Sequence, residues 1–153
     1  MKKPSYWTYR FLSLLGDEIL EIAEDHILTK QKENYQLLMW NYCNYTEAFA
    51  KGDRSSLSLL DRDGAFDAKP ACVRANVPLQ GHYLQTVYTL DKSTSAFHNW
   101  VRMGAPQYPK REQVASLKRT SRPKCKKGEA ASFAGAVTLA PHEVRLYLFE
   151  KEA

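Results

Sequence analysis

The side chains best suited to acid/base chemistry in this sequence are its glutamates. Ten are present, at positions 18, 21, 24, 33, 47, 112, 129, 143, 150 and 152. Hydrolysis by paired carboxyl groups requires two of them close together with different pKa values, one as the acid and one as the base or nucleophile. These glutamates fall in polar turns, helix starts or strand ends, and no surrounding motif predicts a raised pKa. The sequence therefore predicts no catalytic pair.

A calcium loop is the next chemistry to consider. Asp61, Asp63 and Asp67, with Gly64, form an Asp-x-Asp-Gly segment followed by a further aspartate. The full calcium-loop spacing, which ends in a bidentate glutamate, is missing. We therefore expect an ordinary polar loop here.

Histidine metal sites and serine nucleophiles are equally unsupported. The histidines are His26, His82, His98 and His142. They contain no HxxH or HExxH pair, which is the spacing that places two imidazoles on one metal. The clustered serines are Ser55, Ser56 and Ser58. They lie outside any GxSxG elbow. We expect no catalytic residue, no metal site and no cofactor site in this chain.

The tryptophans offer a possible platform for stacking sugar rings. Trp7 lies on the apolar arc of a predicted helix, and Trp40 lies in a predicted strand beside Leu37 and Leu38. Both are therefore expected in the core, where large aromatic side chains contribute most. Trp100 is equally compatible with packing a helical segment on the sheet and with contacting another domain.

Length and composition indicate one globular domain. The chain has 153 residues, of which 44% are hydrophobic and 12% aromatic, which argues against disorder. It contains no run of about 18 apolar residues, and its start does not resemble a signal peptide. Cys43, Cys72 and Cys125 are odd in number and widely spaced, so we expect reduced, mostly buried thiols. These features predict a cytoplasmic protein without a membrane partner.

Positive charge is concentrated in residues 110–127. This segment holds eight Lys or Arg residues and one acid, Glu112, within a net charge of +5 for the whole chain. It lacks the interleaved aromatic residues of a nucleic-acid surface and is predicted to be a short helix and the loop after it. We interpret it as a solvated face and expect no specific nucleic-acid binding.

The elements that position these side chains begin with a helix. Ser5 is predicted to cap it, and Gly16 to end it in the left-handed position. At 100° per residue, its apolar side chains form two arcs. One arc holds Trp7, Phe11, Leu14 and Leu15, and the other holds Tyr6, Tyr9 and Leu12. Such a helix needs neighbours on two sides.

The rest of the chain follows a β pattern that helices interrupt once. Strands are predicted at 19–22, 27–30, 35–42, 71–77, 82–90, 131–139 and 143–150. Strands 71–77 and 82–90 read as a hairpin, and in the last strand residues 144, 146 and 148 face opposite to 145, 147 and 149. Residues 43–69 are expected to be a long connection, and 96–103 and 110–120 short helices. This pattern predicts a mainly β protein, an antiparallel β-sandwich with an N-terminal helix and a short two-helix excursion.

Several segments resemble one enzyme family. The excursion AFHNWVRMGAPQYPKREQVASL (96–117) and the opening KPSYWTYR (3–10) resemble the C-terminal end of glycoside hydrolase family 39, the β-xylosidase family. HYLQTVYTLD (82–91) and LAPHEVRLYLFE (139–150) are similar to strands of the same region. In that family a (β/α)8 barrel with two catalytic glutamates precedes a β-sandwich. The resemblance implies that residues 1–16 correspond to the last barrel helix and 17–153 to an accessory sandwich domain, with its helical excursion at about 96–120.

The resemblance also implies a role. The family's acid/base glutamate lies in an Asn-Glu-Pro motif, which this chain lacks, and 153 residues are too few for a barrel of about 250. The implied function is a non-catalytic accessory region, structural or oligomeric, of a cytoplasmic β-xylosidase-like protein without cofactors. Its expected partners are a (β/α)8 barrel and a second copy, bound through one arc of the first helix. The alternatives are a carbohydrate-binding module and the ligand-side segment of a helix-turn-helix transcriptional regulator.

Overall fold

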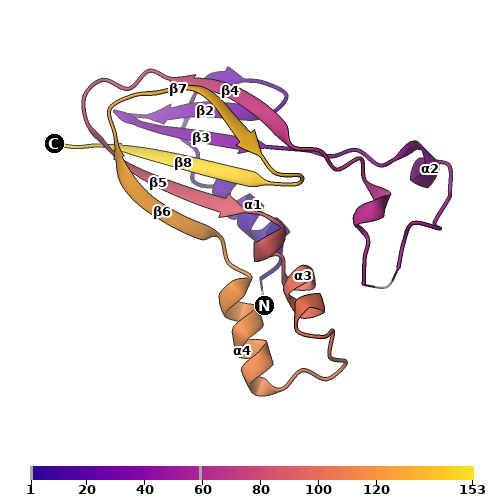
Figure 1. The fold of residues 1–153 in the computed structure, drawn as a ribbon. Helices are drawn as coiled ribbons and strands as arrows, with labels where there is room; N and C mark the ends of the chain where they lie inside the picture. The colour runs from indigo at the N-terminus through magenta and orange to yellow at the C-terminus, as the bar shows by residue number, and fades with distance from the viewer. Residues whose placement is uncertain (1, 59) are drawn as a thin grey trace.

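The computed structural model describes residues 2–58 and 60–153. Its elements, shown in Figure 1, are α1 (Pro4–Leu12), β1 (Glu18–Ile22), β2 (His26–Gln31), β3 (Asn34–Trp40), α2 (Glu47–Ala50), the 3₁₀ turn η1 (Asp63–Ala65), β4 (Ala71–Val77), β5 (Tyr83–Leu90), the 3₁₀ turn η2 (Lys92–Thr94), α3 (Ala96–Arg102), α4 (Arg111–Thr120), β6 (Lys124–Ala130), β7 (Phe133–Leu139) and β8 (Val144–Lys151).

The strands of the described residues form two antiparallel sheets. One is six-stranded, in the order β1-β2-β3-β8-β5-β6, and the other pairs β4 with β7. In Figure 1 the β4–β7 pair lies over one face of the large sheet and α1 lies on the opposite side. The predicted mainly β, antiparallel fold with an N-terminal helix and short helices is confirmed, and its two layers are unequal in size.

The main core lies between the two sheets. β4 contributes its alternate residues Val73, Ala75 and Val77, which are all buried. They pack on side chains of the large sheet, among them Leu37, Met39, Tyr147 and Phe149. The period of two along β4 and β8 places these residues on one face, so the predicted alternation of the last strand is confirmed.

α1 builds a second core on the other face of the large sheet. Phe11 is buried against Leu38, Leu90 and Leu146, and Trp7, Leu14 and Leu15 pack around this cluster. The arc of Tyr6, Tyr9 and Leu12 remains exposed. The two predicted arcs are therefore distinct in the structure, one against the sheet and one toward solvent.

The ends of α1 differ from the prediction. Ser5 lies inside the first turn, because Pro4 occupies the first helical position and Lys3 precedes it without a side-chain cap, as suits a proline with its fixed φ. The helix ends at Leu12, not Gly16. Gly16 is required for a different reason: a Cβ there would lie 2.4 Å from the carbonyl oxygen of Lys30.

The predicted hairpin of residues 71–77 and 82–90 is wrong. β4 pairs along its length with β7, whereas β5 pairs with β6 and β8. The short turn between them carries the chain from one layer to the other, and both Val77 and Tyr83 belong to the core between the sheets. The alternation of apolar and polar residues indicates where strands lie, but it does not indicate which strands pair.

β6 was predicted to be a loop. Its residues 124–129 are exposed on both faces, so no period of two marks the strand in the sequence. Lys124, Lys126 and Lys127 occupy this edge of the large sheet. β1, at the opposite edge, is also exposed throughout and carries an irregularity between Ile19 and Glu21.

The helical excursion matches the prediction closely. α3 and α4 extend together beyond the sheet (Figure 1), with Leu117 buried and Val114 half-buried. The indole N–H of Trp100 donates to the Pro106 carbonyl at 3.0 Å, which closes the turn between the helices. No helix among the described residues has the length and hydropathy that a membrane crossing requires.

Candidate functional site

A cleft of about 790 Å³ lies at the end of β5. Its walls come from six places: the start of α1, the long connection near η1, η2, α3, the start of β6 and the turn between β7 and β8. These segments are distant in the sequence, and the sheet brings them together because β5 and β8 are neighbours. This volume is within the range of small-molecule pockets.

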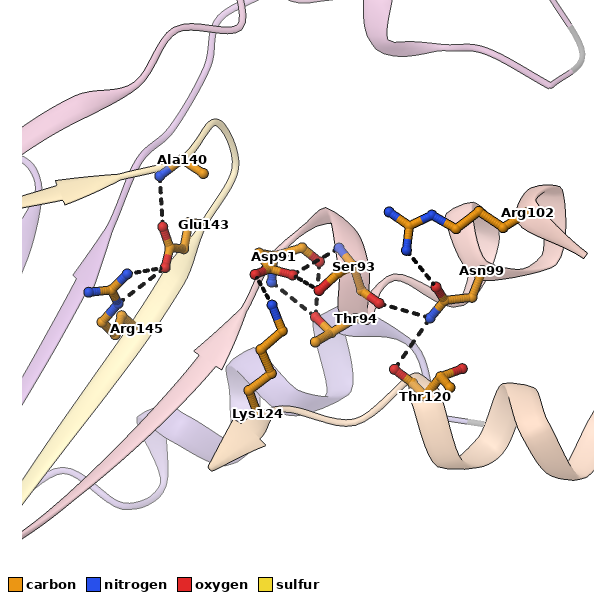
Figure 2. Close-up of polar contacts among 10 residues, drawn as sticks. All are labelled: Asp91, Ser93, Thr94, Asn99, Arg102, Thr120, Lys124, Ala140, Glu143 and Arg145. Carbon is orange, nitrogen blue, oxygen red and sulfur yellow. Dashed lines mark hydrogen bonds and ion pairs between the residues drawn. The ribbon is translucent and has the colours of Figure 1, made fainter. Parts of the chain in front are cut away.

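Asp91 lines the cleft, and Figure 2 shows the polar contacts that it makes there. Its carboxylate accepts hydrogen bonds from the Ser93 N–H at 2.8 Å and from the Lys124 Nζ at 2.6 Å. Thr94 completes a capping box with the Asp91 backbone. Burial would raise the pKa of Asp91, but the hydrogen bonds from Lys124 and Ser93 outweigh it and lower the pKa. Asp91 is therefore an ionised structural carboxylate.

Asn99 fixes the excursion to this wall (Figure 2). Its buried amide group donates to the Ser93 carbonyl at 3.0 Å and to the Thr120 carbonyl at 3.3 Å. It therefore joins η2, α3 and the end of α4. Arg102, one helical turn later, donates to the Asn99 amide oxygen at 3.4 Å.

Asp63 is the second carboxylate of the cleft. It pairs with Lys92, and its Oδ1 lies 3.3 Å from His98 Nε2. The hydrogen bond from Lys92 is the main reason that the pKa of Asp63 is lowered, and the contact with His98 acts in the same direction. Both cleft aspartates are thus held in the charged form by lysines.

Glu143 is a buried carboxylate beside the cleft. It accepts from the Ala140 N–H at 2.7 Å and from Arg145 Nη2 at 2.5 Å, as Figure 2 shows. Burial would lower the pKa of Arg145, but hydrogen bonds from this guanidinium to Tyr147 and Glu143 raise it. The pair closes the β7–β8 turn and leaves Glu143 without a free oxygen for chemistry.

Comparison with known proteins agrees with this architecture. The family model of Glycosyl hydrolases family 39 matches residues 1–138. The chain belongs to glycoside hydrolase family 39. That match covers most of its length and confirms the resemblance seen in the sequence.

Solved family 39 structures share the fold. The chain aligns over 99% of its length with the GH39 enzyme from Xanthomonas axonopodis pv. citri (TM-score 0.72, 15% identity). It aligns over the same share with a monomeric β-xylosidase from Caulobacter crescentus CB15 (TM-score 0.71, 18% identity). In each case the family 39 chain described here spans 31% of the larger chain's length.

The residues singled out in the sequence are dispersed in this family 39 chain. Of the aspartates at 61, 63 and 67, Asp63 enters the cleft, whereas Asp67 pairs with Lys69 at the surface. His98 and His142 line the cleft. His26 lies elsewhere, buried, with Nδ1 2.7 Å from Asp25. Within residues 2–58 and 60–153, no three metal-ligating side chains gather at one point.

The expected burial of the thiols is wrong for two of the three. Cys43 is buried, whereas Cys72 on β4 and Cys125 on β6 are exposed, and all three are free. β4 directs Cys72 away from the core that Val73 enters, and the edge strand β6 is open on both faces.

The cleft residues that the sequence analysis missed are Arg62, Asp91 and Arg102. Arg62 and Arg102 carry no sequence signal, because only the fold brings them to the same cleft. Asp91 had one: an Asp followed by Ser93 and Thr94 before a helical segment is typical of a side-chain-capped turn.

Proposed function

We propose that this chain is a non-catalytic accessory region of a family 39 glycoside hydrolase of the β-xylosidase type. Retaining hydrolysis requires a protonated carboxyl group with a raised pKa about 5 to 5.5 Å from an ionised one. The carboxylates of the cleft, Asp63 and Asp91, both have lowered pKa values and are both bound by lysines. Among the described residues, the cleft therefore has ionised carboxylates but no protonated carboxyl group that could act as the general acid, and this observation carries the proposal.

We propose that α1 provides the contact surface of this accessory region. Its inner arc is covered by the large sheet, and its outer arc presents Tyr6, Tyr9 and Leu12 to solvent. Contiguous apolar surface of this kind is typically a contact site. In a protein that also contains a (β/α)8 barrel, we propose that this arc packs against the barrel, and in the chain alone against a second copy.

A hydrolysis assay tests the absence of catalysis. The purified 153-residue chain is incubated with an aryl β-xyloside beside a matched blank and a complete family 39 β-xylosidase. We expect turnover at the level of the blank. The proposal is wrong if turnover survives repurification and is lost when Asp63→Asn or Asp91→Asn is introduced, because these changes remove the only carboxylates that line the described part of the cleft.

We also propose a cytoplasmic location. Exposed free thiols persist in a reducing compartment and are oxidised elsewhere, and Cys72 and Cys125 are both exposed and free. Alkylation of intact cells before lysis should modify both residues. Recovery of either as a disulfide would contradict the location.

A further inference from the structure

His26 is a buried histidine whose two ring nitrogens both face carboxylates. Its side chain is 4% exposed, with Nδ1 2.7 Å from Asp25 Oδ1 and Nε2 3.2 Å from Glu21 Oε1. His26 begins β2, and Glu21 belongs to the edge strand β1. The antiparallel pairing of these two strands brings the carboxylate to the imidazole, because Ile22 pairs with Ile27 at the turn between them.

Only the contact with Asp25 is a hydrogen bond. A carboxylate can only accept, so the Nδ1 of His26 carries the hydrogen and donates it to Asp25. Nε2 is buried and has no hydrogen-bond partner among the described residues, although the Glu21 oxygen is close. In the neutral ring Nε2 carries a lone pair. This lone pair and a carboxylate oxygen repel each other at such a distance, so the arrangement favours a positive group between them.

The separation of the two atoms fits two ligands of one zinc ion. Zinc lies about 2.0 to 2.1 Å from a histidine nitrogen and about 2.0 to 2.2 Å from a carboxylate oxygen. For atoms 3.2 Å apart, these bond lengths give an angle of about 100° at the metal, close to tetrahedral. Asp25 supplies the carboxylate that usually receives the second ring N–H of a zinc-bound histidine.

The surroundings of Glu21 also suit a cation. Its side chain is half exposed and lines a surface pocket of about 310 Å³ together with Arg74 and Asn76 of β4. Water from this pocket can fill the two positions that a pair of protein ligands leaves open on a tetrahedral ion. Residues 21–25 hold three acids, Glu21, Glu24 and Asp25, and the one base among the lining residues is Arg74. The local charge is therefore negative.

We propose that Glu21 and His26 bind one zinc ion, with Asp25 orienting the imidazole and water at the remaining positions. The imidazole nitrogen selects zinc over magnesium, which prefers oxygen ligands. The ion ties the exposed edge strand β1 to β2. No HxxH spacing marks such a site, because its ligands lie on adjacent strands. The proposal goes beyond the accessory role and does not depend on it, because it requires no contact with a barrel.

Calorimetric titration with zinc chloride tests the proposal, with magnesium chloride as the comparison ion. The measurements use the 153-residue chain with Cys72→Ser/Cys125→Ser, because exposed free thiols bind zinc themselves. We expect one zinc ion per chain, bound saturably and at least about tenfold more tightly than magnesium. The thermal unfolding midpoint should rise with the zinc concentration, because a ligand of the folded state stabilises that state.

Four further variants in the same background locate the ion. Asp25→Asn should weaken zinc binding about 10- to 100-fold, as is usual for the hydrogen-bond partner of a metal ligand. His26→Gln and Glu21→Gln each remove a ligand and should weaken binding at least as much. Glu21 is half exposed, so its variant keeps the fold even if His26→Gln destabilises the chain. His82→Gln removes an exposed histidine outside the site and should leave zinc binding unchanged.

Three results would overturn the proposal: zinc binds no more tightly than magnesium, Glu21→Gln binds zinc as tightly as the background chain, or His82→Gln weakens binding as much as His26→Gln does. The first would mean that a proton lies between the imidazole and Glu21, and the last that zinc binds exposed histidines in general. Hydrolysis of aryl β-xylosides is a separate measurement, so failure of this proposal and failure of the accessory role can be told apart.

Discussion

The outer arc of α1 gives a quantitative test of self-association. Tyr9 is 74% exposed and Leu12 47% exposed, and full burial of one large apolar side chain stabilises by about 1.5 to 3 kcal/mol. A two-fold dimer buries the same arc from both chains. Covering the exposed part of these two side chains in both copies therefore contributes about 4 to 7 kcal/mol, which is roughly three to five decades in Kd.

The perturbation is Tyr9→Ser/Leu12→Ser, studied by sedimentation at tens of micromolar. We expect the unchanged chain to self-associate and the variant to sediment as a monomer. Trp7 and Phe11 are unsuitable for this test, because they face the sheet and their loss would release the helix.

A matched control removes similar apolar surface elsewhere. Tyr108 is 84% exposed and Leu84 46% exposed, and they lie in the excursion and on β5. Tyr108→Ser/Leu84→Ser should leave self-association unchanged. A monomeric unchanged chain, or a dimer that both double variants affect equally, would refute the reasoning, because the outer arc of α1 would then have no special role.

The remaining predictions concern stability and nucleic acid. Phe11→Ala should destabilise the chain by about 3 to 5 kcal/mol, seen as a large drop in the thermal midpoint; a loss below about 1 kcal/mol would mean that α1 is not docked. Asp91→Asn should cost about 1 to 2 kcal/mol at pH 7. Because the folded-state pKa of Asp91 is lowered, its contribution is present above the unfolded-state value of about 3.9 and is lost as the pH falls through the folded-state pKa. Urea unfolding should therefore show the gap between the two proteins narrowing below about pH 4, and a constant gap would contradict the ionic role. At about 150 mM salt, duplex DNA should bind segment 110–127 no more tightly than about 10⁻⁴ to 10⁻⁶ M; nanomolar, sequence-selective binding in a filter assay would instead favour the regulator alternative.

Periodicity predicted the elements that have one buried face. The two arcs of α1, the alternation in β8 and the inward Leu117 of α4 all follow from a face that must leave water. β6 has no buried face, so its sequence KCKKGEA shows no alternation, and the strand was missed. The partner of β4 could not be predicted either, because its pairing with β7 joins segments about sixty residues apart.

The cleft could not be predicted from the sequence for the same reason, because its residues are far apart along the chain. Asp63 and His98 are 35 residues apart, and Asp91 and Lys124 are 33 apart. Each residue alone has an ordinary surface interpretation. Their chemistry arises because β5, β8 and β6 are neighbours in the sheet, and hydrophobic patterns do not encode which strands become neighbours.

The two edges of the large sheet have a consequence for solubility. Open strand edges can pair with other molecules and begin aggregation. β6 presents Lys124, Lys126 and Lys127, and β1 presents Glu18 and Glu21 together with its irregular backbone. Like charges therefore oppose joining of β6 to β6 or of β1 to β1. An acidic β1 edge and a basic β6 edge do not repel each other, so protection against pairing of β1 with β6 of another copy depends mainly on the irregular register of β1 between Ile19 and Glu21.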